Sequence, residues 1–339
     1  MNRSLTPALS LLLAAALAGL TGCSGTTEPS KPDAQDPTGT AASGTPDASA
    51  SYPVTVSNCG TEVTLESPPE RIVTIKSTAL ETLLALGLGS KVVGSAFSDG
   101  PVPGALAADA ASVPVLSEAA PTQEAVLELE PDFIYAGWES NLSSDTAGER
   151  DFLASLGIGS YVSPTACREE GTPGKLDFED VFANITEAGA LFGAPEAAAE
   201  LITEQRSVLD GVTPAGEDQT AFWFSSGRDT PYAGAGLGAP QMMMDALGLV
   251  NIAADVDDSW ASLSWETVVA ANPDVIVLVD ADRNTAESKK ELLASMPATA
   301  GMDAVMNERY LVLPFAAGEA GVRNAEAVAD LADQLSSLP

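Results

Sequence analysis

A pattern of apolar and polar positions occurs twice in this chain. Residues 122–138 and 264–280 each begin with Thr or Ser, continue as a short helix that stops before Pro-Asp, and end in an apolar strand. When the two segments are aligned on Pro-Asp, Glu124 falls on Glu266. The pattern therefore predicts the same helix–strand unit in both halves of the chain.

The similarity extends upstream of both units. A strand at residues 71–75 precedes a helix that Leu-Gly-Leu closes at 86–88, and a strand at 221–224 precedes a helix closed by Leu-Gly-Leu at 247–249. Strands that alternate with helices form mostly parallel sheets. The sequence therefore predicts an α/β fold of two lobes, with a ligand cleft between them.

The expected lobe boundaries follow from the positions of the two repeats. Residues 52–175 form an N-terminal lobe, and residues 194–339 form a C-terminal lobe. Residues 176–193 between them have the apolar spacing of one amphipathic helix. A single connecting helix is stiff, so we expect only a small closure of the lobes.

The N-terminus has the pattern of a secreted lipoprotein. Residues 1–22 carry an early Arg and a short apolar run, which predicts a signal peptide. The following Cys23 completes a segment that resembles the bacterial lipobox, and a diacylated cysteine is a stable membrane anchor. The alternative is ordinary signal cleavage, with Cys23 incidental. Residues 23–51 contain little to bury and are expected to form a disordered tether.

The two remaining cysteines are Cys59 and Cys167. An even number of cysteines in an oxidising compartment favours a disulfide. The alternatives are two free thiols or a thiolate metal site, and the latter lacks further ligands nearby in the sequence.

Composition limits the possible functions. The formal charge of −33 argues against nucleic-acid binding, which requires a basic surface. The chain has no histidine, so catalysis by Ser-His-Asp or Cys-His and imidazole-rich metal sites are excluded. We expect no cofactor, no resident metal and no catalytic residue.

Several loop residues at predicted strand ends are candidates for ligand contact. Ligands bind at the carboxyl ends of strands in open α/β sheets, which places Lys76 near the cleft unless it is an ordinary solvated lysine. Aromatic side chains in the loops suggest a lining for a flat or bulky ligand. These aromatic residues are Phe97, Trp138, Tyr232, Trp260 and Phe315.

From these motifs the chain resembles the substrate-binding proteins of ABC importers for ferric siderophores and cobalamin. The resemblance covers residues 52–338 and rests on segments 69–73, 83–87, 129–132 and 260–273 in this order. It implies two α/β lobes joined by one long helix, and cleft aromatic residues at Phe97, Tyr232 and Trp260.

The resemblance also implies docking residues. In that family a glutamate on each lobe forms a salt bridge with arginines of the permease, and the matching positions are Glu124 and Glu266. The alternative is that both glutamates only stabilise the first turn of their helices through the helix dipole.

A narrower resemblance concerns the cargo. Segments 73–103, 135–141 and 230–254 are similar to an actinobacterial subgroup proposed to import a precursor of the deazaflavin coenzyme F-420. Aromatic residues together with Lys76, Arg228 and Arg323 would suit its ring, phosphate and carboxylate. The same cations would equally suit an anionic ferric siderophore, and cobalamin stays a third candidate.

We therefore expect a binding protein rather than an enzyme. It would be a monomer, lipid-anchored to the outer face of the cytoplasmic membrane of a Gram-positive cell, with ABC permease and ATPase subunits as partners. The alternative from another class is a secreted carboxylate-dependent hydrolase, although no acidic pair stands out. A direct metal-ion receptor is disfavoured by the missing histidines.

Overall fold

A computed structural model of the chain describes residues 51–167, 174–216 and 218–339. The predicted signal peptide, most of the tether and Cys23 lie outside the described residues. We call residues 51–167 the first lobe and residues 218–339 the second lobe.

The first lobe contains a five-stranded sheet in the order β5-β4-β3-β6-β7, and all of its pairs are parallel. Its central strands β3 and β6 are buried along their whole length, as expected for strands covered on both faces. A separate antiparallel hairpin, β1–β2, precedes the sheet. The strands are β1 (Val54–Asn58), β2 (Thr61–Leu65), β3 (Ile72–Ile75), β4 (Val92–Ala96), β5 (Val115–Ser117), β6 (Phe133–Ala136) and β7 (Gly159–Val162). The helices are α1 (Ser77–Ala85), α2 (Ala107–Ala110), α3 (Gln123–Glu128) and α4 (Arg150–Ser155).

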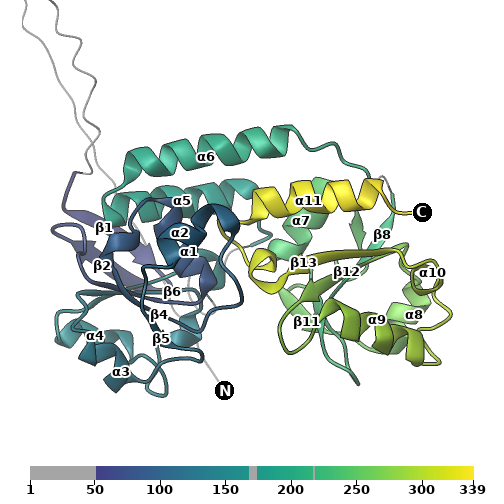
Figure 1. Cartoon of the computed structure of the whole chain (residues 1–339), viewed down its shortest axis with the longest axis horizontal. Coiled ribbons are helices and arrows are strands. Elements are labelled where there is room, and N and C mark those ends of the chain that lie inside the picture. The colour runs from purple at the N-terminus through teal and green to yellow at the C-terminus, as the bar shows by residue number, and fades with distance from the viewer. Residues whose placement is uncertain (1–50, 168–173, 217) are drawn as a thin grey trace, which may run out of the picture. The chain divides into compact units, whose positions relative to one another are not determined.

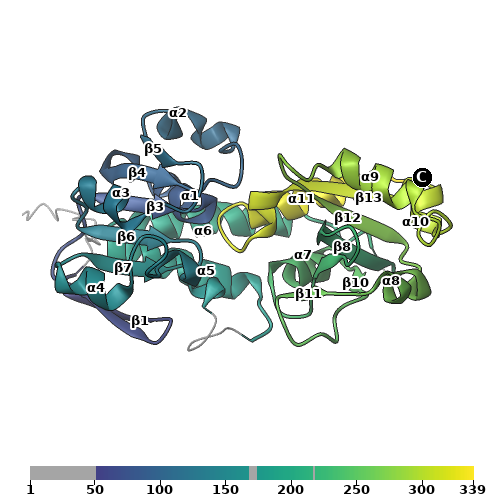
Figure 2. The ribbon, with the colours of Figure 1, turned by 90° about the horizontal axis from the view of Figure 1, so that it is seen from below.

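The second lobe has a six-stranded sheet with the path β11-β9-β8-β12-β13, and β10 pairs with β8. Strands β8, β10, β12 and β13 are parallel, whereas β9 and β11 add an antiparallel edge. Figure 2 shows the first-lobe order from β5 to β7 and, in the second lobe, β12 between β8 and β13. The strands are β8 (Thr220–Ser226), β9 (Tyr232–Gly234), β10 (Val250–Asn251), β11 (Trp260–Ser262), β12 (Val275–Asp280) and β13 (Tyr310–Pro314). The helices are α7 (Ala239–Leu247), α8 (Trp265–Ala271), α9 (Ala286–Ser295), α10 (Asp303–Met306) and α11 (Asn324–Ser336). The predicted α/β class with mostly parallel sheets is confirmed.

The duplicated Pro-Asp unit has the same structural role in both lobes. The carboxylate of Asp132, just before β6, accepts hydrogen bonds from the backbone N–H groups of Glu70 (2.8 Å) and Arg71 (2.9 Å), just before β3. The carboxylate of Asp274, just before β12, accepts from the backbone N–H of Thr220 at the start of β8 (2.8 Å). Hydrogen bonds from the Thr220 backbone and hydroxyl lower the pKa of Asp274. Each aspartate therefore aligns the starts of two neighbouring central strands.

Two helices connect the lobes. The helix expected at 176–193 is α5 (Phe178–Phe192), which begins with a capping box at Asp177 and ends at Gly193 with φ 77°. Its Phe192 ring packs on Tyr135 and Tyr161 of the first sheet. The chain turns back at once into α6 (Pro195–Asp210), which contacts both α5 and α11 of the second lobe (Figure 1). The connection therefore consists of α5 and its antiparallel neighbour α6.

The predicted disulfide is present. Cys59 in the turn of the β1–β2 hairpin is bonded to Cys167, 108 residues later and beyond β7. The bond ties the hairpin to the first sheet. No helix in the described ranges is long and apolar enough to cross a membrane.

Candidate ligand-binding site

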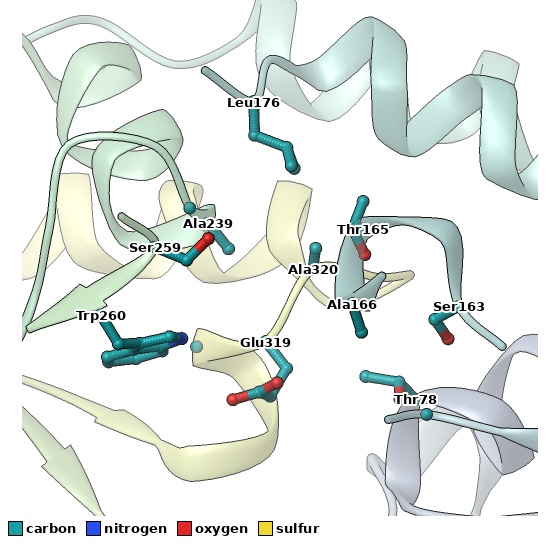
Figure 3. A pocket seen from close by; sticks show the side chains of 13 residues that line it. Thr78, Ser163, Thr165, Ala166, Leu176, Ala239, Ser259, Trp260, Glu319 and Ala320 are labelled. Atoms are coloured by element: carbon teal, nitrogen blue, oxygen red, sulfur yellow. The ribbon is translucent and has the colours of Figure 1, made fainter. Parts of the chain in front are cut away.

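A small cavity lies between the two lobes (Figure 3). The first lobe contributes Thr78, Gly137, Ser163, Thr165 and Ala166, and Leu176 precedes the connecting helices. The second lobe contributes Gly238, Ala239, Ser259, Trp260 and residues 318–320. The cavity volume is about 40 Å³. Sites for small-molecule ligands usually measure about 300–1,000 Å³, so the lobes have to separate before a bulky ligand can enter.

The carboxyl ends of the first-lobe strands supply the residues at this edge. Lys76 directly follows β3, Phe97 directly follows β4, and Trp138 is the second residue after β6. Lys76 and Phe97 have positive φ angles of 79° and 56°. Non-glycine residues adopt such angles at an energetic cost, and they concentrate at functional sites. Lys76, Phe97 and Trp138 therefore lie at the same edge of the first sheet, where the sequence placed its candidate contacts at strand ends.

Lys76 lies at the centre of an aromatic cluster. Its Nζ is 3.6 Å from the ring centroid of Trp138, 4.4 Å from Phe97 and 5.3 Å from Phe315 of the second lobe. The same ammonium group forms an ion pair with Asp99, and both side chains are buried, at 2% and 5% exposure. The cation is therefore neutralised and enclosed by aromatic rings within the protein.

Arg323 is engaged in the same way. Its guanidinium group forms a two-pronged ion pair with Glu81 of α1, with one N–O distance of 2.5 Å, and also donates to the carbonyl of Pro101 (2.9 Å). The side chains are 12% and 2% exposed. Burial raises the pKa of Glu81, and Arg323 offsets part of that rise. This ion pair joins the second lobe to the first.

A hydrogen bond forms a second link between the lobes. The indole N–H of Trp138 donates to the carboxylate of Glu319, with a distance of 3.0 Å. Phe97 packs edge-on against the same indole, with centroids 5.8 Å apart. Glu319 follows β13 and lines the cavity, so Trp138 contacts the cavity wall through it.

The antiparallel edge of the second lobe carries a stacked aromatic pair. The rings of Tyr232 on β9 and Trp260 on β11 lie 6.0 Å apart at an angle of 13°. Trp260 lines the cavity, whereas Tyr232 is 37% exposed. Arg228 lies in the exposed loop after β8, where its backbone carbonyl accepts a hydrogen bond from the indole of Trp265 (2.8 Å).

Of the eight side chains predicted to contact a ligand, only Trp260 lines the cavity directly. The structure brings Lys76, Phe97, Trp138 and Phe315 together beside it, whereas Arg228 is not part of its lining. Their roles as ligand contacts stay predictions.

The prediction missed the hydroxyls of Thr78, Ser163, Thr165 and Ser259 and the carboxylate of Glu319. The strand-end rule that singled out Lys76 would also have found Ser163 after β7 and Glu319 beyond β13.

The two glutamates paired by the repeat are both exposed in the first turn of a helix, Glu124 on α3 and Glu266 on α8. Thr122 and Ser264 cap these helices by accepting hydrogen bonds from the backbone three residues later. The pKa of Glu266 is lowered by hydrogen bonds from its own backbone and from Ser264.

Among the described residues there is no group of three or more Cys, Asp or Glu side chains that could hold a metal ion.

Two of the proteins with similar sequences show what this chain resembles. An uncharacterized ABC transporter substrate-binding lipoprotein, YvrC of Bacillus subtilis, is 25% identical over 300 residues, covering 84% of this chain and 86% of that protein. A cobalamin-binding protein of Halobacterium salinarum is 33% identical over 252 residues, covering 70% of this chain. The aligned region spans 62% of the cobalamin-binding protein, which is less than two thirds of its length.

A solved structure and a family description agree with these relatives. The ABC-type Fe3+-hydroxamate transport system from Saccharomonospora viridis is 26% identical, with a TM-score of 0.72 over 85% of this chain and 100% of that chain. Residues 72–317 match the family described as periplasmic binding protein. This chain therefore belongs to the periplasmic binding proteins, the substrate-binding components of ABC transporters, and is not an enzyme.

Proposed function

We propose that the protein captures a bulky chelate of the ferric siderophore type between its lobes and delivers it to an ABC permease. The observation that carries this proposal is the interlobe cavity, with tryptophan and hydroxyl side chains on opposite walls. Such a lining suits a ligand that is flat or bulky and rich in hydrogen-bonding groups.

The cargo proposal is supported by the structure of the similar Fe3+-hydroxamate transport protein. Two other cargoes fit the same role. Cobalamin is suggested by the name of the Halobacterium relative, and a deazaflavin precursor is suggested by the narrower sequence resemblance.

A fluorescence titration of the full chain in mild detergent tests the cargo. The ligands are a ferric trihydroxamate, cobalamin and the deazaflavin precursor. Trp260 and Trp138 are the expected reporters, because Trp260 lines the cavity and Trp138 contacts its wall through Glu319. We expect saturable quenching by one of these classes. If none of them quenches the fluorescence, this cargo list is wrong.

We further propose that Glu124 and Glu266 dock the protein on arginines of the permease. Both glutamates are exposed, and they occupy equivalent positions in the two lobes. The double variant Glu124→Ala/Glu266→Ala should bind cargo normally but fail to support uptake. Glu287 and Glu326 are matched controls, since they are also exposed acids in the first turn of a helix. Equal uptake by the docking variant and the control variant would contradict the docking role.

The proposed location is the outer face of the cytoplasmic membrane of a Gram-positive cell. The protein would be a monomer held by a diacylated Cys23, in line with the lipoprotein relative from Bacillus subtilis. Intact-mass analysis of the membrane-extracted protein should find two acyl chains and no residues 1–22. An unmodified Cys23 would refute the anchor.

A further inference from the structure

We infer that the cargo site continues beyond the interlobe cavity into a second, uncharged pocket at α5, where the side chain of Asn184 binds a carboxamide on an arm of the cargo. This inference rests on the proposed function, because it adds a subsite for the same cargo and names the chemical group that enters it.

The second pocket adjoins the interlobe cavity. Ser163, Thr165 and Ala320 line both of them. The second pocket has a volume of about 20 Å³ and extends to Asn184 on α5. In the present arrangement of the lobes, such a volume accommodates about one water molecule or one small group of a ligand. A cargo in the interlobe cavity therefore has a route past the three shared residues to the connecting helix once the lobes separate.

Asn184 is a polar residue on the apolar face of α5. Val181 and Ala188, one turn away on either side, are buried, and so is the adjacent Ile185. Asparagine is disfavoured in helix interiors, because its side chain competes with the backbone for hydrogen bonds. Among the described residues, none forms a hydrogen bond with the side-chain amide of Asn184. Its donor and acceptor are therefore available to a ligand group that enters the pocket.

The wall of the second pocket has no charged side chain among the described residues. Its polar side chains are those of Thr82, Tyr135, Ser163, Thr165 and Asn184. Burial raises the pKa of Tyr135, so its phenol stays neutral. An ionised group in this pocket would lose its hydration without gaining a counter-charge, which is strongly unfavourable. The pocket therefore favours an uncharged polar group.

The hydroxyls around Asn184 differ in their engagement. Thr82 donates its hydroxyl hydrogen to the carbonyl of Thr78 (2.7 Å), and Ser163 donates to the hydroxyl of Tyr135 (3.5 Å). These two donors are thus used within the protein, whereas the amide of Asn184 offers both a donor and an acceptor. Asn184 is therefore the residue that we expect to read the ligand group.

A carboxamide matches the side chain of Asn184 better than the other common polar groups do. The asparagine amide has an acceptor oxygen and a donor nitrogen side by side, and a carboxamide on the ligand has the same pair. Two hydrogen bonds can then form in one plane. An ionised carboxylate only accepts and an ammonium group only donates, so each of them satisfies half of this arrangement. A group that displaces water without reproducing its hydrogen bonds loses affinity.

Two forms of one chelate test the inference. A linear ferric trihydroxamate is prepared with its terminal amine succinylated, which leaves a carboxylate, and with the same terminus converted to the primary carboxamide. The two forms have the same length and differ only in the terminal group. The full chain in detergent is titrated with each form, and affinity is measured from tryptophan fluorescence. We expect the carboxamide form to bind at least about tenfold more tightly, because the carboxylate would be buried without a counter-charge.

The variant Asn184→Leu keeps a side chain of similar size but removes the amide. It should weaken binding of the carboxamide form about fivefold, as expected for the loss of one or two neutral hydrogen bonds, and change the carboxylate form little. Thr186→Ala is the control, because Thr186 is an exposed residue of α5 that does not line the pocket. Unfolding temperatures without ligand identify any loss of fold. Equal affinity for the two forms, or an equal loss for both in Asn184→Leu, would overturn the inference.

A second measurement separates this inference from the cargo proposal. If neither form of the chelate binds, the cargo proposal loses its hydroxamate class, and a small probe tests the subsite directly. The side-chain amide signal of Asn184 in a ¹⁵N NMR spectrum is assigned by its loss in Asn184→Leu. Millimolar propionamide should shift this signal, whereas propionate should leave it in place. No shift with propionamide, or an equal shift with propionate, would overturn the carboxamide subsite whatever the cargo is.

Discussion

The ion pair between Arg323 and Glu81 permits a quantitative prediction. Replacing Arg323 by Met keeps most of the apolar stem but leaves the Glu81 carboxylate, which is 2% exposed, without its counter-charge. Removing one partner of a buried ion pair typically costs about 3–5 kcal/mol. We expect a loss of about 3 kcal/mol, the lower end of that range, because the pair joins two lobes and their separation would admit water. For a protein of this size, such a loss lowers the unfolding temperature by about 6 °C.

The pH dependence of this loss follows from the pKa of Glu81. Burial raises that pKa above its ordinary value of 4.5, so the folded state holds the proton to a higher pH than the unfolded state does. The folded protein therefore loses stability as the pH rises through the interval between the two pKa values. Without Arg323 the folded-state pKa rises further, which extends this loss to higher pH. The variant should thus be close to the unaltered protein near pH 4 and should show its full loss well above the raised pKa.

Calorimetry of both proteins at about pH 4 and about pH 8 measures this difference directly. A control is the double variant Glu81→Gln/Arg323→Met, which removes both charges and should recover much of the lost stability. If Arg323→Met lost the same amount at both pH values, or if the double variant were the least stable, a buried charge pair would not be the correct description of this contact.

Two further predictions concern the first lobe. Replacing Cys59 and Cys167 by Ser should reduce the free energy of unfolding, measured by chemical denaturation, by about 2–5 kcal/mol, because the disulfide closes a loop of 108 residues. An unchanged free energy of unfolding would contradict a stabilising role of the disulfide. Gly137→Ala should displace Lys76 and lower the free energy of unfolding by about 1–3 kcal/mol, because the new Cβ would lie 2.6 Å from the Cβ of the lysine. Gly104→Ala is the control, since a Cβ at that position would have no atom within 4 Å. Equal thermal stability of the two variants would refute the close approach at Gly137.

The fold was accessible from the sequence because it is encoded locally and twice. Each Pro-Asp unit contains its own helix cap, helix stop and buried strand within about 17 residues, which is a scale at which local rules operate. Asp132 and Asp274 were notable in the sequence only as part of the repeated pair. Their actual role, which is to bind the starts of neighbouring strands, requires contacts across 54 or more residues.

The chemistry of the site was less accessible because it depends on distant partners. Arg323 and Glu81 are 242 residues apart, and Trp138 and Glu319 are 181 residues apart. A lysine or arginine at a strand end has the same local pattern whether it faces a ligand or a carboxylate of the protein. The sequence therefore predicted where cations lie near the cleft, but it could not predict which of them were already neutralised.

The two lobes also differ where they meet, and this limits what a repeat can predict about cargo. Both lobes retain the aspartate at the strand start and the exposed glutamate in the first turn of the preceding helix. At the cavity, by contrast, the first lobe contributes mainly hydroxyls, whereas the second contributes Trp260 and Glu319. The features shared by the lobes are those that a common scaffold and a two-point docking surface require. The features that differ are those in contact with the cavity, so the contacts with the cargo have to be inferred from this asymmetric wall rather than from the repeat.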